Sequence, residues 1–120
     1  SPFRLLIVDD NALLTESLAR CFARRGYRVR TATTAEDAEL VTRDEGVDCG
    51  IFDIHLGEDD GLVLAWKLLH AGRVRSAVFF SAVVDAAVLA RASALGTFVP
   101  KGASLEKLDR VIDELRWGKA

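Results

Sequence analysis

Five polar side chains stand at the ends of short apolar runs in this 120-residue sequence: Asp9, Asp10, Asp53, Ser81 and Lys101. Three are carboxylates, one is a hydroxyl and one is an ammonium group. If the runs are parallel strands, their carboxyl ends meet at one edge of a sheet, where ligands bind in such folds. Three neighbouring carboxylates repel one another, and a bound divalent cation relieves that repulsion. Mg²⁺ prefers oxygen ligands and leaves coordination places free for a phosphate.

This combination of groups predicts a site that accepts a phosphoryl group. With Mg²⁺ bound, the Asp53 carboxylate can act as a nucleophile toward phosphorus and form an aspartyl phosphate. The Lys101 ammonium and the Ser81 hydroxyl could contact the other phosphoryl oxygens and balance their charge. A nucleophile, metal ligands, a cation and a hydrogen-bond donor would then all be present.

Each residue alone also has a simpler interpretation. An acidic pair after a strand is often a turn or a helix cap, and Asn11 offers the same capping chemistry. Asp53 could be a cap, Ser81 an ordinary strand-end hydroxyl and Lys101 a solvated charge. Their coincidence at four of five predicted strand ends favours the joint interpretation.

Five runs rich in apolar, β-branched and aromatic residues are the candidate strands: Leu5–Val8, Tyr27–Ala32, Cys49–Phe52, Ala77–Phe80 and Thr97–Val99. Continuous apolar runs of this length are typical of strands buried on both faces. The run at 27–32 alternates in polarity, which favours a place nearer the edge of the sheet.

Helical patterns separate these runs. The residues predicted to face the core are Leu14, Leu18, Cys21 and Phe22 in the first helix, Leu62, Trp66 and Leu69 in the third, and Leu105, Leu108, Ile112 and Leu115 in the fifth. Thr34 with Asp37 predicts the start of the second helix, and Ser104 can cap the start of the fifth. Residues 85–95 are predicted to form the fourth helix. Five βα repeats predict an α/β fold, a parallel sheet with helices on both faces.

Composition excludes several classes of protein. Sixteen basic and 18 acidic residues give a net charge of −2, so the chain has no general attraction for nucleic acid or anionic membranes. Cys21 and Cys49 form no metal-binding motif, and two reduced cysteines suit a cytosolic protein. The most apolar stretch, Ala77–Val84, is far shorter than the ~20 residues of a membrane helix. Because the chain lacks methionine and opens on Ser-Pro, we expect it to be cut from a longer protein.

Over essentially its whole length, the sequence resembles the receiver domain of two-component response regulators. The matching segments are LLIVDD at the first strand, FDIHLGEDDG around Asp53, FFSA at the fourth strand and FVPKGAS at the fifth. Gly61, eight residues after Asp53, also stands where the family places a glycine. Each motif alone is weak, but their order and spacing are specific.

The resemblance implies one receiver domain over residues 1–120, with a doubly wound, flavodoxin-like sheet of strand order 2-1-3-4-5 and five helices. It implies that Asp53 accepts phosphate from a sensor histidine kinase or a phosphotransfer protein. Asp10 and Asp53 would ligate Mg²⁺, with help from Asp9 and from the main-chain carbonyl of His55.

The resemblance also implies a switch. Ser81 would move toward the phosphoryl group, and Phe98 would swing between exposed and buried positions, which changes the surface of the fourth helix, fifth strand and fifth helix. That surface could pair two copies of the domain. The expected protein is a bacterial, cytoplasmic signalling module that phosphorylates and dephosphorylates only itself, without membrane or direct nucleic-acid contact. An attached output domain would lie outside this sequence.

Two departures from the family pattern concern prolines. Gly57 stands where the family usually has proline, so the acidic loop that follows is expected to be looser. Lys101 is followed by Gly102 instead of a cis proline, and a Lys–Gly bond is expected to be trans.

His55 is expected to face solvent, although its side chain could instead alter access of water to the phosphoryl group.

Three other functions remain open at this point. An aspartyl phosphatase would need a second acid two residues after the nucleophile, where His55 stands. A flavin or nucleotide carrier would need an anion-binding loop after the first strand, where Asp9 and Asp10 repel a phosphate that lacks metal. A pure interaction module would not need the full set of five side chains.

Trp66 and Trp117 are expected to be packing or rim residues, and Trp117 could instead touch a neighbouring domain.

Overall fold

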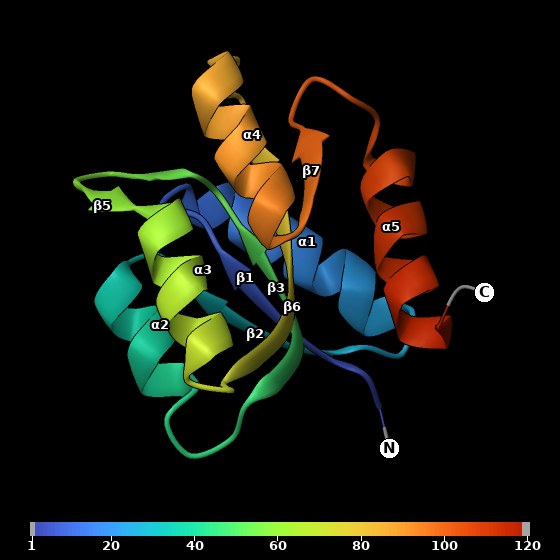
Figure 1. Ribbon diagram of the computed structural model, residues 1–120. Coiled ribbons are helices and arrows are strands. Elements are labelled where there is room, and N and C mark those ends of the chain that lie inside the picture. Colours follow the sequence, from blue (N-terminus) through green and yellow to red (C-terminus); the bar gives the residue numbers. More distant parts are fainter. Residues whose placement is uncertain (1, 119–120) are drawn as a thin grey trace.

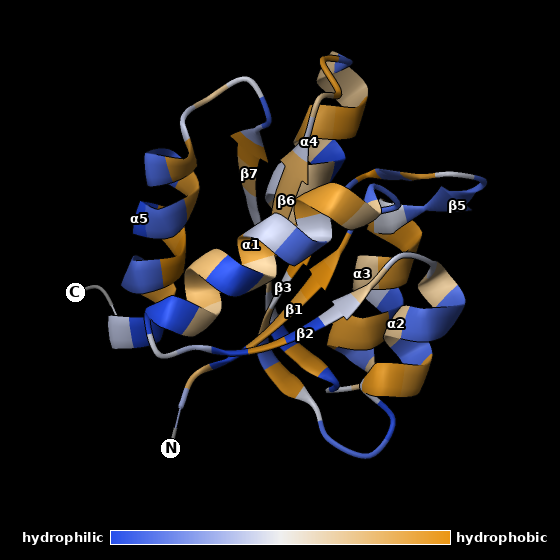
Figure 2. Ribbon diagram, turned by 180° about the vertical axis from the view of Figure 1, so that it is seen from behind, coloured by the Kyte–Doolittle hydropathy of each residue, from blue (hydrophilic) through white to orange (hydrophobic). Residues whose placement is uncertain are grey.

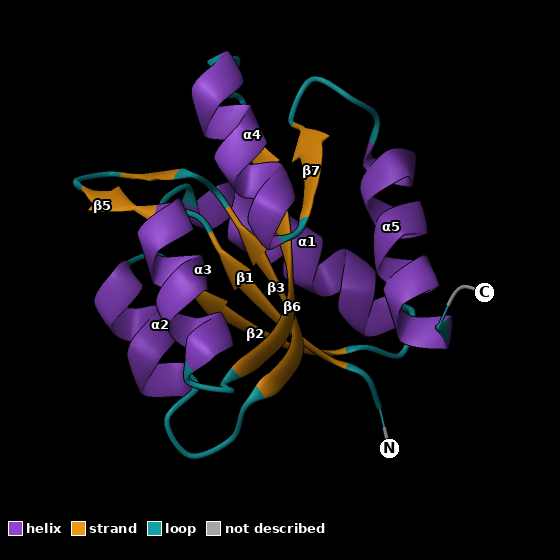
Figure 3. Cartoon of the chain, in the orientation of Figure 1, coloured by secondary structure: helices purple, strands orange, loops and turns teal. Residues whose placement is uncertain are grey.

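The computed structural model describes residues 2–118 and contains one five-stranded parallel sheet. Its strands are β1 (Arg4–Val8), β2 (Arg28–Ala32), β3 (Val47–Phe52), β6 (Val74–Ser81) and β7 (Thr97–Pro100). They lie in the order β2-β1-β3-β6-β7, seen edge to edge in Figure 3. The predicted order 2-1-3-4-5 is therefore confirmed for the main strands, because β4 and β5 belong to a separate short hairpin.

Helices cover both faces of the sheet (Figure 1). They are α1 (Ala12–Arg24), α2 (Ala35–Val41), α3 (Gly61–His70), α4 (Ala86–Leu95) and α5 (Leu105–Trp117). The helices α2, α3 and α4 pack on one face, and α1 and α5 pack on the other. This is the doubly wound, flavodoxin-like arrangement that the sequence predicted.

The central strands are buried on both faces. In β1, Leu6 and Val8 pack toward α2, α3 and α4, whereas Leu5 and Ile7 pack toward α1 and α5. Such alternation explains why the strands appear in the sequence as continuous apolar runs. The strand β2 lies at the edge and exposes most of its residues, which confirms the prediction from its alternating pattern.

The predicted buried faces of two helices are partly wrong. In α1, Cys21 is exposed, and the buried residues are Thr15, Leu18 and Phe22. In α3, Trp66 is half exposed, because residues 61–62, 64–65 and 68 turn toward the sheet. A helix turns by roughly 100° per residue, so a small rotation against the sheet exchanges which apolar residue is covered.

Side-chain caps fix where several helices begin. The Asn11 side chain accepts a hydrogen bond from the Leu14 amide, and the Thr34 hydroxyl accepts one from the Asp37 amide, both at 3.1 Å. Ser104 does occupy the N-cap of α5, but its side chain makes no capping hydrogen bond within residues 2–118. No helix in that described range is long and apolar enough to cross a membrane.

Burial of α1 can be tested with two substitutions on the same helix. Phe22 is 1% exposed and belongs to the same core cluster as Leu5 and Ile7, so Phe22→Ala should lower the free energy of unfolding by about 3–5 kcal/mol. Leu13 is 77% exposed, so Leu13→Ala should change it by less than about 0.5 kcal/mol. Urea denaturation measures both. Equal destabilisation by the two substitutions would contradict the described orientation of α1.

Candidate functional site: three carboxylates and a lysine at the strand ends

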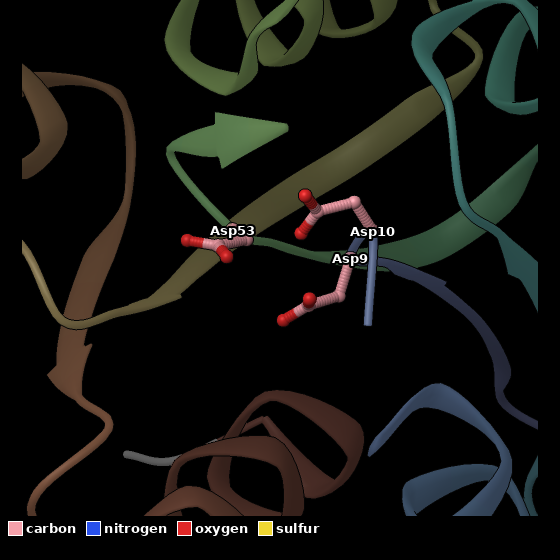
Figure 4. A group of neighbouring side chains, drawn as sticks. All are labelled: Asp9, Asp10 and Asp53. Carbon is pink, nitrogen blue, oxygen red and sulfur yellow. The ribbon is translucent and has the colours of Figure 1, made fainter. Parts of the chain in front are cut away.

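The structure brings three carboxylates together at the carboxyl end of the sheet. Strands β1 and β3 pair in parallel with Val8 opposite Phe52, so the residues that follow each strand are neighbours. One carboxylate oxygen from each of Asp9, Asp10 and Asp53 lies within 4.8 Å of the other two (Figure 4). The three side chains that the sequence predicted to converge therefore form one cluster.

Lys101 places its ammonium group against two of these carboxylates. Its Nζ lies 2.7 Å from Asp9 Oδ2 and 2.9 Å from Asp53 Oδ2. The backbone supports this position, because the Lys101 amide donates a hydrogen bond to the Ser81 carbonyl at 2.9 Å. The peptide bond to Gly102 is trans, as are all others in residues 2–118, which confirms the expectation for this departure from the family.

The carboxylates differ in their surroundings. Asp9 is 3% exposed and Asp53 is 8% exposed, whereas Asp10 is exposed to solvent and lies outside the Lys101 ion pairs. Asp9 Oδ1 also accepts a hydrogen bond from the Asn11 amide at 2.9 Å. A single ammonium balances only part of the charge of three carboxylates, so the site keeps a net negative charge.

The neighbouring carboxylates also change the acidity of the lysine. Burial alone lowers the pKa of Lys101, because it penalises the charged form. Hydrogen bonds to Asp9 and Asp53 and the charges of these carboxylates outweigh burial and raise the pKa above its ordinary value. Lys101 therefore stays protonated at neutral pH and remains a cation within the site.

The donor set fits a hard divalent cation. All three candidate ligands are carboxylates, and Mg²⁺ and Ca²⁺ both prefer oxygen ligands. Asp10 has solvent access and no ammonium partner among the described residues, so it is free to accept a cation. A divalent ion would also supply the positive charge that Lys101 alone does not.

Ser81 lies at the end of β6, and Phe98 lies within β7. Ser81 is buried at the end of β6, and its hydroxyl accepts a hydrogen bond from the Val83 amide at 3.5 Å. No hydrogen bond within residues 2–118 joins it to the three aspartates. Phe98 lies on β7 opposite Phe79, half-buried against the core beneath α2, α3 and α4.

The loop after Asp53 forms a short hairpin that the sequence did not predict. His55–Leu56 (β4) and Asp59–Asp60 (β5) pair as an antiparallel hairpin, and Gly57 at its turn has a φ of +60°. Asp59 accepts a hydrogen bond from the Ala35 amide at the start of α2, and Asp60 accepts one from the Leu62 amide at the start of α3. The acidic loop thus links the site to two helices, and the His55 side chain faces solvent as expected.

Gly61 has a structural role that the sequence analysis did not recognise. Its amide donates a hydrogen bond to the Ile54 carbonyl at 2.7 Å, and a Cβ there would lie 1.9 Å from the Asp53 carbonyl oxygen. Only glycine permits so close an approach of α3 to the backbone of Asp53. An aspartate, a glycine and an apolar run in succession form a helix-start signal that could have identified Asp60 as the cap.

Comparison with known proteins identifies a family. The family model of the response regulator receiver domain matches residues 5–113. The chain is 33% identical over 107 residues to the alginate biosynthesis transcriptional regulatory protein AlgB of Pseudomonas aeruginosa, an alignment that covers 88% of this chain and 24% of that protein. It is 28% identical over 115 residues to the chemotaxis protein CheY of Treponema pallidum, covering 92% of this chain and 76% of that one.

A solved structure is similar over nearly the whole chain. It is a response regulator protein from Burkholderia pseudomallei, crystallised with a phosphorylated aspartic acid, a calcium ion and citrate. It superposes with a TM-score of 0.82 at 26% identity, covering 98% of this chain and 73% of the other.

The fold and the family match together define the class of this protein. The chain belongs to the response regulator receiver domain family, whose members are the signalling domains of two-component systems. It spans about a quarter of the length of the AlgB proteins that it matches.

The close approach of α3 to Asp53 gives a direct test of the site's construction. Gly61→Ala forces a Cβ into the Asp53 carbonyl, so it should lower the free energy of unfolding by about 1–3 kcal/mol or more. Gly102→Ala is the matched control, because no atom lies within 4 Å of its Cβ and its backbone needs no left-handed conformation. Chemical denaturation compares the two. If Gly61→Ala is as harmless as Gly102→Ala, the described approach is wrong.

Proposed function

We propose that this domain, over residues 1–120, is a phosphorylation-dependent signalling switch whose phosphoryl acceptor is Asp53. The observation that carries the proposal is the position of the Asp53 carboxylate. It is nearly buried, 2.9 Å from the Lys101 ammonium and within 4.8 Å of two further carboxylates. The phosphorylated aspartic acid of the Burkholderia pseudomallei protein supports the same chemistry here.

The proposed donor is a phosphohistidine of a sensor histidine kinase or a phosphotransfer protein. An oxygen of the Asp53 carboxylate attacks phosphorus, a P–O bond forms, and the P–N bond to the histidine breaks. The imidazole leaves and the product is an aspartyl phosphate. Lys101 pairs with the Asp53 carboxylate before transfer, and its ammonium can then pair with a phosphoryl oxygen.

The domain would also reverse this modification. A water molecule attacks phosphorus, the bond between phosphorus and the Asp53 oxygen breaks, and inorganic phosphate leaves. The free carboxylate is restored, so the domain acts only on itself and is not an enzyme for other substrates.

The proposed cofactor is Mg²⁺, held by the carboxylates of Asp10 and Asp53, with Asp9 and the main-chain carbonyl of His55 assisting. When bound, the ion would neutralise negative charge on the transferring phosphoryl group. The cluster of three carboxylates supports a cation at this place, as does the calcium ion present in the Burkholderia pseudomallei structure.

The proposed switch begins at Ser81. The hydrogen bond that its hydroxyl accepts from the Val83 amide is long, at 3.5 Å, so the hydroxyl can turn toward a phosphoryl group on Asp53 at little cost. The Ser81 carbonyl holds the Lys101 amide, and Phe98 lies three residues before Lys101 on β7. A movement at Ser81 would therefore alter the burial of Phe98 and the surface of α4, β7 and α5.

The proposed partners follow from this surface and from the relatives. The AlgB proteins are transcriptional regulators about four times as long as their match to this chain, which supports an output domain attached to this one. The α4–β7–α5 surface could pair two receiver domains. The net charge of −2 supports no nucleic-acid or membrane contact by this domain itself, and we place it in the cytoplasm with its kinase.

Mass spectrometry of the intact domain tests the proposal. Incubation with Mg²⁺ and acetyl phosphate should add one phosphoryl group, because the Asp53 carboxylate lies beside the Lys101 ammonium and the proposed metal ligands. Chelation of Mg²⁺ should abolish the adduct, and Asp53→Asn should not form it.

Two outcomes would overturn this function. An adduct that persists in Asp53→Asn would place the acceptor elsewhere. Turnover of added phosphate esters without a lasting adduct would instead favour an aspartyl phosphatase.

A further inference from the structure

The helices α3 and α4 leave an apolar groove between them on the surface. It has a volume of about 310 Å³ and is lined by Leu62, Val63, Trp66, Arg91, Ala94 and Leu95. The two helices lie side by side on the same face of the sheet (Figure 1). Trp66 is 50% exposed and Val63 is 45% exposed, so two large apolar side chains face solvent at this groove. Neither is needed for the core or for the carboxylate site.

The Trp66 side chain is held in one orientation by its own helix. Its ring stacks on the ring of His70, with a centroid distance of 4.2 Å and an interplanar angle of 30°. The His70 Nδ1 in turn lies 2.9 Å from the Trp66 carbonyl oxygen, within hydrogen-bond distance. An aromatic side chain that is already ordered loses little conformational entropy when a partner covers it. A partner that covers Trp66 would therefore cost the side chain little conformational entropy.

Among the described residues that line the groove, the one charged side chain is Arg91, and none is acidic. Lys67 of α3 instead lines a separate hollow toward α2, together with Glu39, Asp59 and Asp60. The chain nevertheless contains more acidic than basic residues. The nearest carboxylates in the chain, Asp60 and Asp85, accept hydrogen bonds from backbone amides at the helix starts. Figure 2 shows the contrast with α5, whose outer face is strongly hydrophilic.

We propose that this α3–α4 groove binds an acidic segment of a partner protein through one aromatic or aliphatic anchor side chain. The volume lies at the lower end of the ~300–1,000 Å³ of small-molecule pockets, which suits a single large side chain. A flanking carboxylate of the partner would pair with Arg91. The pairing adds specificity to the apolar contact.

A second copy of this chain fits the groove less well. A symmetric dimer places the same patch on both sides of the interface. Arg91 of one copy would then face a lining whose one charged side chain is the other copy's Arg91. The proposed contact also differs from pairing through α4, β7 and α5, and it does not depend on phosphorylation of Asp53.

Selection from a random dodecapeptide display library tests the chemistry of the partner. The protein is the full 120-residue chain, and peptides that also bind the Trp66→Ala variant are removed by counter-selection. We expect the retained peptides to combine Asp or Glu with one Trp, Phe or Leu. Failure to retain any peptide, or enrichment of basic or uncharged peptides, would overturn the proposal.

The NMR signals of the two tryptophan indole groups report where the peptide binds. In ¹⁵N-labelled protein, a synthetic peptide of the selected sequence should shift the indole signal of Trp66 and leave that of Trp117 unchanged. Trp117 serves as an internal control because it is 73% exposed at the end of α5, far from this groove in the sequence and on the other face of the sheet. A shift confined to Trp117 would place the contact elsewhere and contradict the proposal.

Charge reversal separates recognition from a general effect on folding. Arg91→Glu and Trp66→Ala should each weaken peptide binding at least tenfold, whereas Arg110→Glu and Trp117→Ala on α5 should leave it within twofold. A peptide with Lys in place of its acidic residues should regain binding to Arg91→Glu. Absence of that rescue would refute charge pairing at the groove. Self-association of the wild type that Trp66→Ala abolishes would assign the groove to a second copy instead.

Discussion

Mutual repulsion among Asp9, Asp10 and Asp53 is the constraint on which the rest of this site depends. At an effective dielectric constant of ~20, two like charges about 4 Å apart repel by about 4 kcal/mol. Parallel pairing of β1 with β3 makes the three side chains neighbours, so the fold itself creates the repulsion. Lys101 offsets it for Asp9 and Asp53, but Asp10 lies outside these ion pairs. A further cation would relieve the repulsion that Lys101 does not offset, as the proposed metal-dependent acceptor requires.

The surrounding elements are joined to this cluster at several points. Gly61 brings the start of α3 against the backbone of Asp53, and the hairpin after Asp53 is hydrogen-bonded to the starts of α2 and α3. On the other side, the Lys101 amide is bonded to the Ser81 carbonyl, which links β7 to the end of β6. A change of charge on Asp53 is therefore in a position to move helices and strands on either side of the site, which is how a local modification can alter a distant surface.

Much of this arrangement could be predicted from the sequence, and the failures have physical causes. Runs such as Leu5–Val8 are apolar because both faces of the sheet are covered, so strands, topology and the convergence of the aspartates follow from the pattern. Cys21 and Trp66 were assigned to buried faces because sequence spacing does not fix the rotation of a helix against a sheet. The β4–β5 hairpin has strands of two residues, too short for any periodicity. The double ion pair of Lys101 depends on a side-chain conformation that no sequence pattern encodes.

Thermal unfolding of Asp10→Asn beside the wild type, in EDTA and in Mg²⁺, tests most directly whether the aspartates form a cation site. In EDTA the variant should melt at a higher temperature, because one repulsive charge is removed. In Mg²⁺ the wild type should gain more stability than the variant, because the variant lacks a ligand. Glu58→Gln, an exposed charge change in the adjacent hairpin, should leave the Mg²⁺ gain intact. A variant that melts lower in EDTA and gains as much from Mg²⁺ as the wild type would show that Asp10 holds no cation.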